Sequence, residues 1–347
     1  MTPSIRLVIA GTGLIGKRHI ASISRCNGVE LSAIVDPSDA GKSYAAEMGM
    51  PWYGSLSEMF AKERPDGVIL ATPNQVHVDN GLECVTARCP MLVEKPLATS
   101  ADEAVVLVDA ARNAGVPILV GHHRRHNPLI RTAREMIDAG KIGQLRAVHA
   151  NCWMYKPDEY FDAAPWRKAQ GAGPVSVNLV HDVDLIRYLC GDVVSVQAQA
   201  ARSIRGYDNE DVAAAVLQFE NGAIGTITVS DIIVSPWSWE LTSRENPAYP
   251  PTAQSCYLLG GTHGSLSLPD LTLWKNNGTR SWWQPISATT FPRDASDPLI
   301  NQIAQFAAVI SGFEEPLVSG EEGLKTLQVI ESIQISAKSG ETIFLQY

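Results

Sequence analysis

The amino-acid sequence predicts two domains: an α/β domain with a doubly wound parallel sheet, then an α+β domain with an open, mostly antiparallel sheet. The length of 347 residues is typical of about two domains. The first third alternates short apolar runs with amphipathic segments, as parallel strands joined by helices do. Hairpin signals replace that alternation after about residue 125. We therefore expect domains over residues 1–124 and 125–347.

The strands expected in the first domain are short and apolar, without strict alternation of polar and apolar positions. That pattern is typical of parallel strands buried on both faces. They are Ile5–Ala10, Glu30–Val35, Asp66–Ala71, Met91–Glu94 and Pro117–Gly121. One helix is expected from near Ile15 to Asn27-Gly28. Another begins at the capping box formed by Ser100 and Glu103 and ends at Gly115.

The second domain combines helices with hairpins. The turn at Asn221-Gly222 is the strongest of the hairpin signals. The helices are expected at Pro128–Ala139, Leu179–Leu189, Pro298–Ser311 and Glu321–Ser339. The strands are expected at Leu145–Cys152, from Val193, at Val212–Glu220, Ala223–Ser230, Leu271–Lys275, Arg280–Gln284 and Thr342–Gln346. The segment Met154–Gly173, rich in aromatic residues, Pro and Gly, is expected to be irregular.

Composition narrows the class of protein. The formal net charge is -9, from 28 basic and 37 acidic residues, which disfavours a general nucleic-acid or anionic-membrane binder. No apolar stretch approaches the roughly 20 residues of a membrane span. The apolar start, broken by glycines, is expected to be a first strand rather than a secretory signal. The six cysteines include no CxxC pair, so we expect reduced thiols and a cytoplasmic protein.

A glycine-rich loop follows the first expected strand and opens the first helix. Its residues are Gly11, Thr12, Gly13, Leu14, Ile15 and Gly16. Glycines there permit a tight turn, a close approach of the backbone to a pyrophosphate, and close packing of the helix on the strand. The N–H groups of the helix N-terminus then face the phosphates. The loop therefore predicts a dinucleotide site, and a plain glycine-rich turn is the alternative.

Asp36 ends the second expected strand, twenty residues after Gly16. That spacing is expected of a carboxylate that accepts hydrogen bonds from the adenosine ribose hydroxyls. A carboxylate also repels a 2′-phosphate, and residues 37–41 contain no Arg to offset it. NAD is therefore favoured over NADP as the cofactor.

Glu94-Lys95-Pro96 lies at the end of another expected strand. Residues at the carboxyl edge of a parallel sheet face the ligand crevice. A lysine there can orient a substrate hydroxyl and stabilise a developing alkoxide. Taken alone, a single lysine favours the plainer interpretation, a surface lysine before a loop.

At this point the sequence resembles the Gfo/Idh/MocA oxidoreductases, a family named after glucose–fructose oxidoreductase, inositol dehydrogenase and a rhizopine-catabolism protein. The resemblance covers nearly the whole chain. The motifs that carry it are Gly11–Gly16, Ala71-Thr72-Pro73-Asn74 with His77, Glu94-Lys95-Pro96, Trp166-Arg167, His181-Asp182 and residues 318–323. It implies a Rossmann domain followed by an α+β domain, whose sheet commonly forms the interface of a homodimer or homotetramer.

The resemblance also implies roles for residues. Lys95 would contact both substrate and nicotinamide, with a cis bond to Pro96, and His181 would be the general acid/base. The cofactor would be lined by Thr72, Pro73, Asn74, His77, Glu94, Lys95, His123, Trp166 and Arg167. These residues, with the glycine-rich loop and Asp36, make up the expected cofactor site.

One position departs from the family pattern. Many members carry an Asp four residues before the catalytic His, where this sequence has Val177, followed by Asn178. Asn can hydrogen-bond a substrate hydroxyl but cannot relay a proton at neutral pH. Proton transfer then depends on His181 and Lys95, with Asp184 as an orienting carboxylate.

Two further groups of residues invite a binding role. Residues 122–126, His-His-Arg-Arg-His, have metal-ligating types, but neighbours after a strand diverge, so no metal site is expected. Arg124 is expected within reach of substrate, with salt bridges to the protein's acids as the alternative for this Arg pair. Tyr155 belongs to an aromatic stretch that could stack on a sugar ring or simply pack in the core.

The sequence thus predicts an NAD-dependent enzyme that transfers hydride between the nicotinamide and a secondary hydroxyl of a sugar, cyclitol or related polyol. One alternative is a dehydrogenase of a cyclic dihydrodiol or hydroxy-semialdehyde from an aromatic pathway. The other is a non-catalytic NAD(P)-binding regulator, which the presence of both Lys95 and His181 disfavours. The expected partners are a small-molecule substrate and further copies of the chain, without nucleic acid or membrane.

Overall fold

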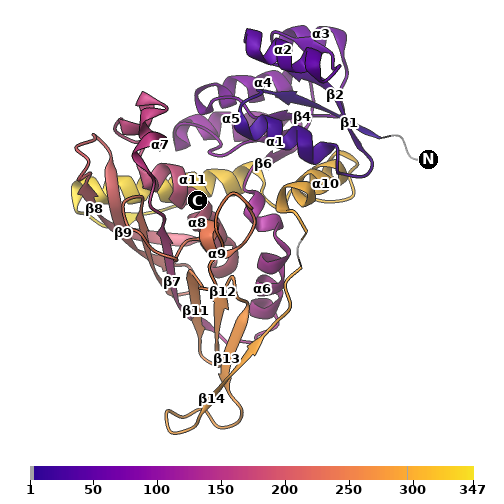
Figure 1. Ribbon diagram of the computed structural model, residues 1–347. Helices are drawn as coiled ribbons and strands as arrows, with labels where there is room; N and C mark the ends of the chain where they lie inside the picture. Colours follow the sequence, from indigo (N-terminus) through magenta and orange to yellow (C-terminus); the bar gives the residue numbers. More distant parts are fainter. Residues whose placement is uncertain (1–3, 295) are drawn as a thin grey trace. The chain divides into compact units, whose positions relative to one another are not determined.

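The computed structural model describes residues 4–294 and 296–347. These residues form two compact units (Figure 1). Unit 1 consists of residues 4–127 and 296–327, and unit 2 of residues 128–294 and 328–347. In this described part of the chain, no helix is long and apolar enough to cross a membrane.

Unit 1 is built on a six-stranded parallel sheet with the strand order β3-β2-β1-β4-β5-β6. The strands are β1 (Ile5–Ala10), β2 (Val29–Val35), β3 (Trp52–Tyr53), β4 (Gly67–Leu70), β5 (Met91–Val93) and β6 (Ile118–Val120). Leu7, Val8 and Ile9 are all fully buried, because helices cover both faces of the sheet. The prediction of a doubly wound parallel sheet is confirmed, with the two-residue strand β3 as an addition.

The helices of unit 1 are positioned by local signals. They are α1 (Leu14–Ile23), α2 (Asp39–Glu47), α3 (Leu56–Lys62), α4 (His77–Thr86), α5 (Ala101–Ala114) and α10 (Pro298–Ile310). The Ser100 hydroxyl accepts a hydrogen bond from the Glu103 N–H at 3.3 Å, and Gly115 ends α5 in the left-handed conformation. The expected N-cap at Ser100 and the helix end at Gly115 are confirmed, while the Glu103 carboxylate accepts a hydrogen bond from the Thr99 hydroxyl. Helix α1 ends at Ile23, four residues before the expected Asn27, and a turn follows it.

The structure groups residues 296–327 differently from the expected division of the chain. That division assigned all of 125–347 to the second domain. In the structure, residues 296–327 belong to unit 1. Ile303, Phe306 and Val309 of α10 share one apolar core with Leu7 and Ile9 of β1. Sequence periodicity shows that α10 is amphipathic but does not specify which sheet its apolar face will cover. Helix α11 (Gly320–Ser339) begins in unit 1 and ends in unit 2.

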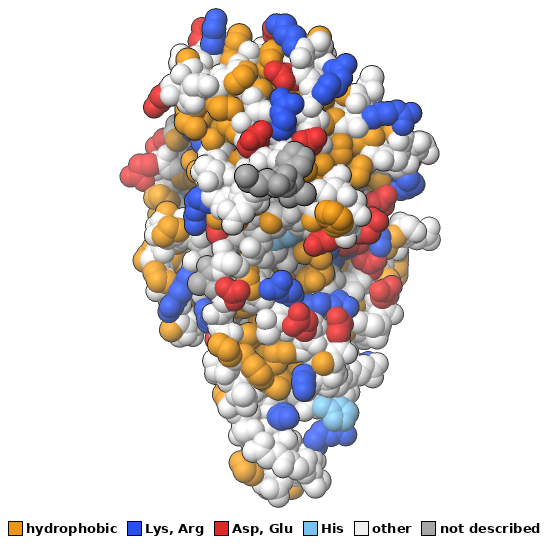
Figure 2. All heavy atoms as spheres, turned by 90° about the vertical axis from the view of Figure 1, so that its right-hand side faces the viewer, with side chains coloured by type: hydrophobic (Ala, Val, Ile, Leu, Met, Phe, Trp, Pro, Cys, Tyr) orange, Lys and Arg blue, Asp and Glu red, His pale blue; other side chains and the backbone are white. Residues whose placement is uncertain are grey.

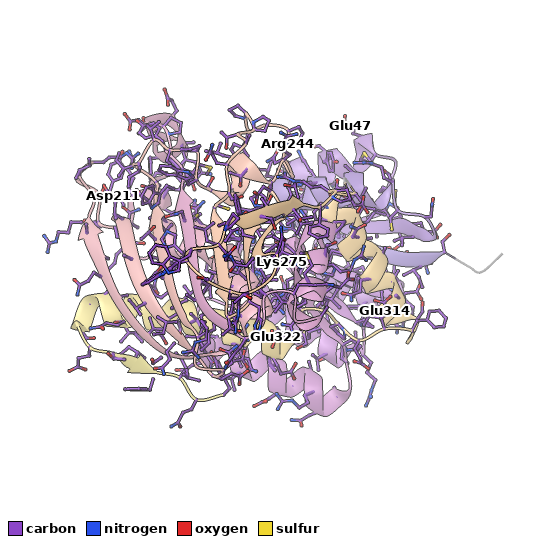
Figure 3. The ribbon with its side chains drawn as sticks, turned by 90° about the horizontal axis from the view of Figure 1, so that it is seen from below. Glu47, Asp211, Arg244, Lys275, Glu314 and Glu322 are labelled. Carbon is purple, nitrogen blue, oxygen red and sulfur yellow. The ribbon has the colours of Figure 1, made fainter. Side chains whose placement is uncertain are left out.

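Unit 2 is built on a nine-stranded sheet with the order β14-β13-β12-β11-β7-β10-β9-β8-β15. Its strands are β7 (Leu145–Trp153), β8 (Val193–Arg202), β9 (Glu210–Phe219), β10 (Ile224–Ser230), β11 (Tyr257–Gly261), β12 (Ser265–Leu268), β13 (Thr272–Asn276), β14 (Ile286–Thr290) and β15 (Ile343–Phe344). Only β7 and β10 pair in parallel, so the prediction of a mostly antiparallel sheet is confirmed. Figure 3 shows Asp211 on β9 and Lys275 on β13 well apart across these strands.

The expected hairpin at Asn221-Gly222 forms between β9 and β10, and Gly222 has a φ of 81°. The strand expected at Arg280–Gln284 is wrong: these residues lie in the connection, and β14 begins at Ile286. The reason is that β14 pairs Ile286 with Asn276 and so needs a longer connection than the Asn277-Gly278 turn implies.

One face of the unit 2 sheet carries its apolar core. Helices α6 (Pro128–Asp138) and α8 (Val180–Cys190) and the second half of α11 contribute to this core. The expected irregular segment Met154–Gly173 contains the short helix α7 (Asp158–Asp162) and a 3₁₀ turn at Pro165–Lys168. A π-helical turn, Val175–Leu179, precedes α8 and was not expected from the sequence.

Candidate functional site

The glycine-rich loop of unit 1 occupies the turn between β1 and α1. A Cβ atom on Gly16 would lie 2.0 Å from the carbonyl oxygen of Gly11, and one on Gly11 would lie 2.4 Å from that of Ala71. Gly11 also has a φ of 94°, which favours glycine. The first-turn N–H groups of α1 have no acceptor within the helix and are available to an anion. The local geometry therefore fits a pyrophosphate.

Asp36 follows β2 and accepts four hydrogen bonds. Oδ2 accepts from the Thr12 N–H at 2.8 Å and the Thr12 hydroxyl at 2.6 Å. Oδ1 accepts from the Ser38 N–H at 2.9 Å and the Ser38 hydroxyl at 2.6 Å. Burial opposes ionisation of Asp36, but these hydrogen bonds outweigh it and lower the pKa of Asp36 below its usual value. The two hydroxyl donors occupy lone pairs that a ribose diol could take in their place.

A cavity of about 600 Å³ opens in unit 1 beside this carboxylate. Its lining includes six of the expected cofactor residues: Gly11, Thr12, Gly13, Asp36, Thr72 and Pro73. Asn74 and His77 are not among the lining residues. Leu56, Val76 and Asn80 also line the cavity, and sequence reasoning missed them. Leu56 begins α3, Val76 directly precedes α4 and Asn80 lies in the first turn of α4, and no motif marked them.

His77 is one of the residues expected in the cofactor site. Its side chain is fully buried. Nδ1 lies 2.9 Å from the Pro96 carbonyl oxygen, and Nε2 lies 2.9 Å from the Thr72 carbonyl oxygen. The ring therefore connects two loops of unit 1 and is withdrawn from the cavity.

Glu94 is buried at the end of β5. Its Oε1 accepts a hydrogen bond from His19 Nε2 at 2.7 Å, and its Oε2 accepts one from the Lys95 N–H at 3.2 Å. Burial opposes ionisation, but the hydrogen bond from His19 and the charge of Lys95 lower the pKa of Glu94 to about 2. The Lys95–Pro96 bond is cis, as the resemblance implied. The carboxylate therefore holds the backbone that carries Lys95.

The residues after β6 form a 3₁₀ turn, His123–His126. Burial and the charge of Arg124 lower the pKa of His123 to about 3, so its ring is neutral near pH 7. Arg124 is buried as well. Arg125 donates to Glu322 at 2.9 Å, which is the salt-bridge alternative weighed for this Arg pair. Among the residues that the structure describes, no group of three or more His, Cys, Asp or Glu side chains could hold a metal ion.

In unit 2, Asn178 lies in the π-helical turn and His181 in the first turn of α8. His181, Asp182 and Asp184 are buried. The Tyr257 hydroxyl donates to Asp182. The turn and the helix are continuous in the chain, so the structure keeps Asn178 and His181 on one helical segment.

The other expected residues of unit 2 come from the segment before α8. Trp166 is 57% exposed, whereas the Arg167 guanidinium stacks 4.1 Å from the centre of the Tyr160 ring and donates to the Tyr160 carbonyl at 2.6 Å. Tyr155 is exposed, with the Arg205 guanidinium over its ring.

A buried ionic cluster lies near this segment and was missed by sequence reasoning. Asp231 accepts from Arg205 at 3.0 Å and lies 3.6 Å from Lys156 Nζ. Burial lowers the pKa of Lys156 despite the carboxylate of Asp231. These residues are far apart in the sequence, so no local pattern joins them.

Two protein-family models match the chain. Residues 5–122 match an oxidoreductase family with an NAD-binding Rossmann fold. Residues 130–267 match the GFO/IDH/MocA C-terminal domain. The two matches agree with the separate sheets of the two units.

Individual relatives cover most of the chain. The 1,5-anhydro-D-fructose reductase of Ensifer adhaerens is 26% identical over 335 residues, 96% of each protein. The 4-carboxy-2-hydroxymuconate-6-semialdehyde dehydrogenase of Sphingobium sp. is 28% identical over 242 residues, 65% of this chain and 72% of that protein. A crystal structure of the WlbA dehydrogenase from Bordetella pertussis, in complex with NADH and UDP-GlcNAcA, aligns with a TM-score of 0.79 and 28% identity over 99% of both chains. With both of its domains matched, the chain belongs to the Gfo/Idh/MocA family of NAD-binding oxidoreductases.

Proposed function

We propose that this protein is an NAD-dependent dehydrogenase that transfers hydride between the nicotinamide and a secondary hydroxyl carbon of a sugar, cyclitol or related polyol. The observation that carries the proposal is the cavity of unit 1, which joins the glycine-rich loop, Asp36 and Thr72 in one place. The sugar-directed relatives support the substrate class. The cofactor supplies the hydride chemistry when bound, and the protein supplies position and charge.

NAD rather than NADP is the proposed cofactor. Asp36 would accept hydrogen bonds from the 2′-OH, and its negative charge would repel a 2′-phosphate. Its pKa is lowered, which favours the charged form. A Cβ on Gly41 would lie 2.3 Å from Cγ of Asp36, so only glycine leaves the carboxylate in place.

The proposed chemistry divides between two residues. Lys95 would donate a hydrogen bond to the reacting oxygen and favour the charge that builds on it. His181 would take up the hydroxyl proton, because imidazole exchanges protons near neutral pH. Asn178 would bind a substrate hydroxyl without taking its proton.

Further residues are proposed to recognise the ligands. Trp166 and Arg167 would contact the cofactor. Tyr155 would stack on the apolar face of a sugar ring, and Arg124 would bind its polar substituents. The neutral ring of His123 would pack beside the nicotinamide.

A homodimer or homotetramer through the unit 2 sheet is part of the proposal. Strand register aligns Gln197, Val216, Thr226, His149 and Leu258 across five adjacent strands on one face. Four of these five side chains are exposed and none is a Lys, Arg, Asp or Glu. On the face that Figure 2 shows, charged side chains of both signs lie among the others. A row of uncharged, mostly exposed side chains across a sheet is typical of a surface that a second copy covers.

A second candidate function has one observation in its favour. One of the relatives is the semialdehyde dehydrogenase of Sphingobium sp., so the alternative substrate is a hydroxy-semialdehyde or cyclic dihydrodiol. A non-catalytic NAD-binding regulator remains the third alternative, and the presence of Lys95 and His181 argues against it.

The test is the formation of NADH, followed by its absorbance, across a panel of sugars, sugar acids, inositols, dihydrodiols and semialdehydes. Turnover of one polyol class with NAD, and much less with NADP, is the expected result. Semialdehyde turnover alone would select the second candidate. Tight NAD binding by calorimetry without turnover of any compound would overturn the enzyme proposal in favour of the regulator.

A further inference from the structure

Two buried histidines flank the segment that carries Lys95. Both His19 and His77 are fully buried. His19 comes from α1 and His77 from the first turn of α4, so two different helices supply them. Neither ring lines the cofactor cavity.

On the N-terminal side of Lys95, the contact runs through Glu94. His19 Nε2 donates to one carboxylate oxygen at 2.7 Å, and the Lys95 N–H donates to the other at 3.2 Å. A Cβ on Gly121 would lie 2.9 Å from Cδ of Glu94, so the backbone of residue 121 closes the space beside the carboxylate. The helix that begins at the phosphate loop is thereby joined to the backbone of Lys95.

On the C-terminal side, the contact is direct. His77 Nδ1 lies 2.9 Å from the carbonyl oxygen of Pro96, and Nε2 lies 2.9 Å from that of Thr72. Thr72 lines the cofactor cavity. One ring therefore connects the loop that lines the cavity to the residue next to Lys95.

Ordinary core packing does not account for this arrangement. Carbonyl oxygens only accept, so the ring donates to both when each nitrogen carries a proton, and a neutral ring donates to one of them. In either state, a histidine that only filled space would not bring both nitrogens to hydrogen-bonding distance from two main-chain carbonyls. Both carbonyls belong to the two loops that the proposed chemistry uses. Likewise, His19 contacts the Glu94 carboxylate, which also accepts a hydrogen bond from the Lys95 N–H.

We propose that His77 is a positioning residue that holds the backbone of Lys95 on the side opposite the His19–Glu94 contact and helps set where its ammonium group lies. This inference rests on the proposed function, in which Lys95 acts on the reacting oxygen. Because His77 also holds Thr72, it couples the cavity loop to Lys95, and a cofactor that orders one loop would order the other.

The test compares His77→Phe, which keeps a ring but removes both nitrogens, with His77→Gln, which retains an N–H donor. Cys84→Ala is the matched control, since Cys84 is fully buried on the same helix. His77→Phe should lower kcat about 10–100-fold, as expected of a slightly misplaced catalytic group. The Kd for NADH should change by less than about threefold, and His77→Gln should recover part of kcat. Equal kcat values for His77→Phe and Cys84→Ala would overturn the proposal.

A second measurement needs no turnover. The lysines of the full chain are ¹³C-methylated, and the Lys95 signal is assigned in the NMR spectrum by its loss in Lys95→Arg. Addition of NADH should move this signal in the wild type and in Cys84→Ala, but much less in His77→Phe. The same response in all three would overturn the coupling. A response that depends on His77, without turnover of any compound, would refute the proposed function and support the positioning role.

If His77→Phe does not fold, the proposal is tested on the wild-type protein instead. In ¹⁵N-labelled protein, a His77 ring N–H bonded to a buried carbonyl should exchange slowly with solvent, and its signal should move together with that of Lys95 on addition of NADH. A rapidly exchanging His77 ring, or one indifferent to NADH, would contradict the proposal.

Discussion

The two units use opposite kinds of sheet, and their polar residues are placed accordingly. The parallel sheet of unit 1 is buried on both faces, so its polar groups gather where strands end: Asp36 after β2, Thr72 after β4 and Glu94 after β5. The sheet of unit 2 has one covered face and one exposed face, and its candidate residues come from a helix and an irregular segment. In a parallel sheet, polar residues at the strand ends thus indicate where the site lies. An open antiparallel sheet gives no such indication.

The proposed function assigns cofactor binding to unit 1 and proton transfer to unit 2. Replacing His181 by Ala should have the largest effect and separate these two roles most clearly. Turnover should fall about 10²–10⁴-fold, because a general acid/base is lost, while the Kd for NAD changes less than about twofold. Steady-state kinetics and calorimetry measure the two effects. His263→Ala, at an exposed position of unit 2, is the control. Unchanged turnover in His181→Ala would remove this residue from the mechanism.

The converse change is Gly16→Ala in unit 1. Its Cβ would lie 2.0 Å from a backbone oxygen that cannot move away freely, so the phosphate loop must distort. Affinity for NAD should fall on the order of 100-fold by calorimetry. Gly278→Ala in unit 2 is the control, because a Cβ there meets no described atom within 4 Å. Equal affinities in the two variants would break the assignment of cofactor binding to the loop.

The buried carboxylate of Glu94 should make stability depend on pH. Its pKa is about 2 in the folded protein against an ordinary value of 4.5, so the ionised form stabilises the fold above about pH 4.5. That contribution, on the order of 3 kcal/mol, is lost as the pH falls from about 4.5 towards 2. In urea unfolding, Glu94→Gln should be less stable than the wild type at neutral pH, and the gap should narrow in acid. Glu47→Gln, at an exposed position, is the control; a gap independent of pH would contradict the prediction.

The smallest expected effect concerns cofactor choice. Asp36→Asn keeps the shape of the side chain but loses its charge and half of its acceptors. The Kd for NAD should rise about tenfold, and the preference for NAD over NADP should narrow. Asp39→Asn, an exposed neighbour on α2, should leave both values unchanged. Preserved discrimination in Asp36→Asn would mean that another part of unit 1 selects the cofactor.

How much of the fold and of the candidate site could be predicted from sequence depends on how far apart in the chain the interacting residues lie. The turn at Gly11–Gly16, the cap at Ser100 and the hairpin at Asn221-Gly222 depend on neighbours in the chain, and all three formed. The contact of His77 with Pro96 spans 19 residues, and that of Arg205 with Lys156 spans 49. Such contacts form only in the completed fold. The motif therefore identifies His77 but does not predict which residues its ring contacts.

The core that α10 shares with β1 has a consequence for synthesis. Ile303 and Phe306 cover the same core as Leu7 and Ile9, yet almost 300 residues separate them in the chain. During translation the first strands leave the ribosome long before the helix that covers them. A fragment that stops at residue 127 would expose that core to water, and at 25 cal/mol per Å² even a few such side chains cost several kcal/mol. A stable piece of this nucleotide-binding fold is therefore expected to include residues 296–327, so the domain can be completed only after residue 327 has been made.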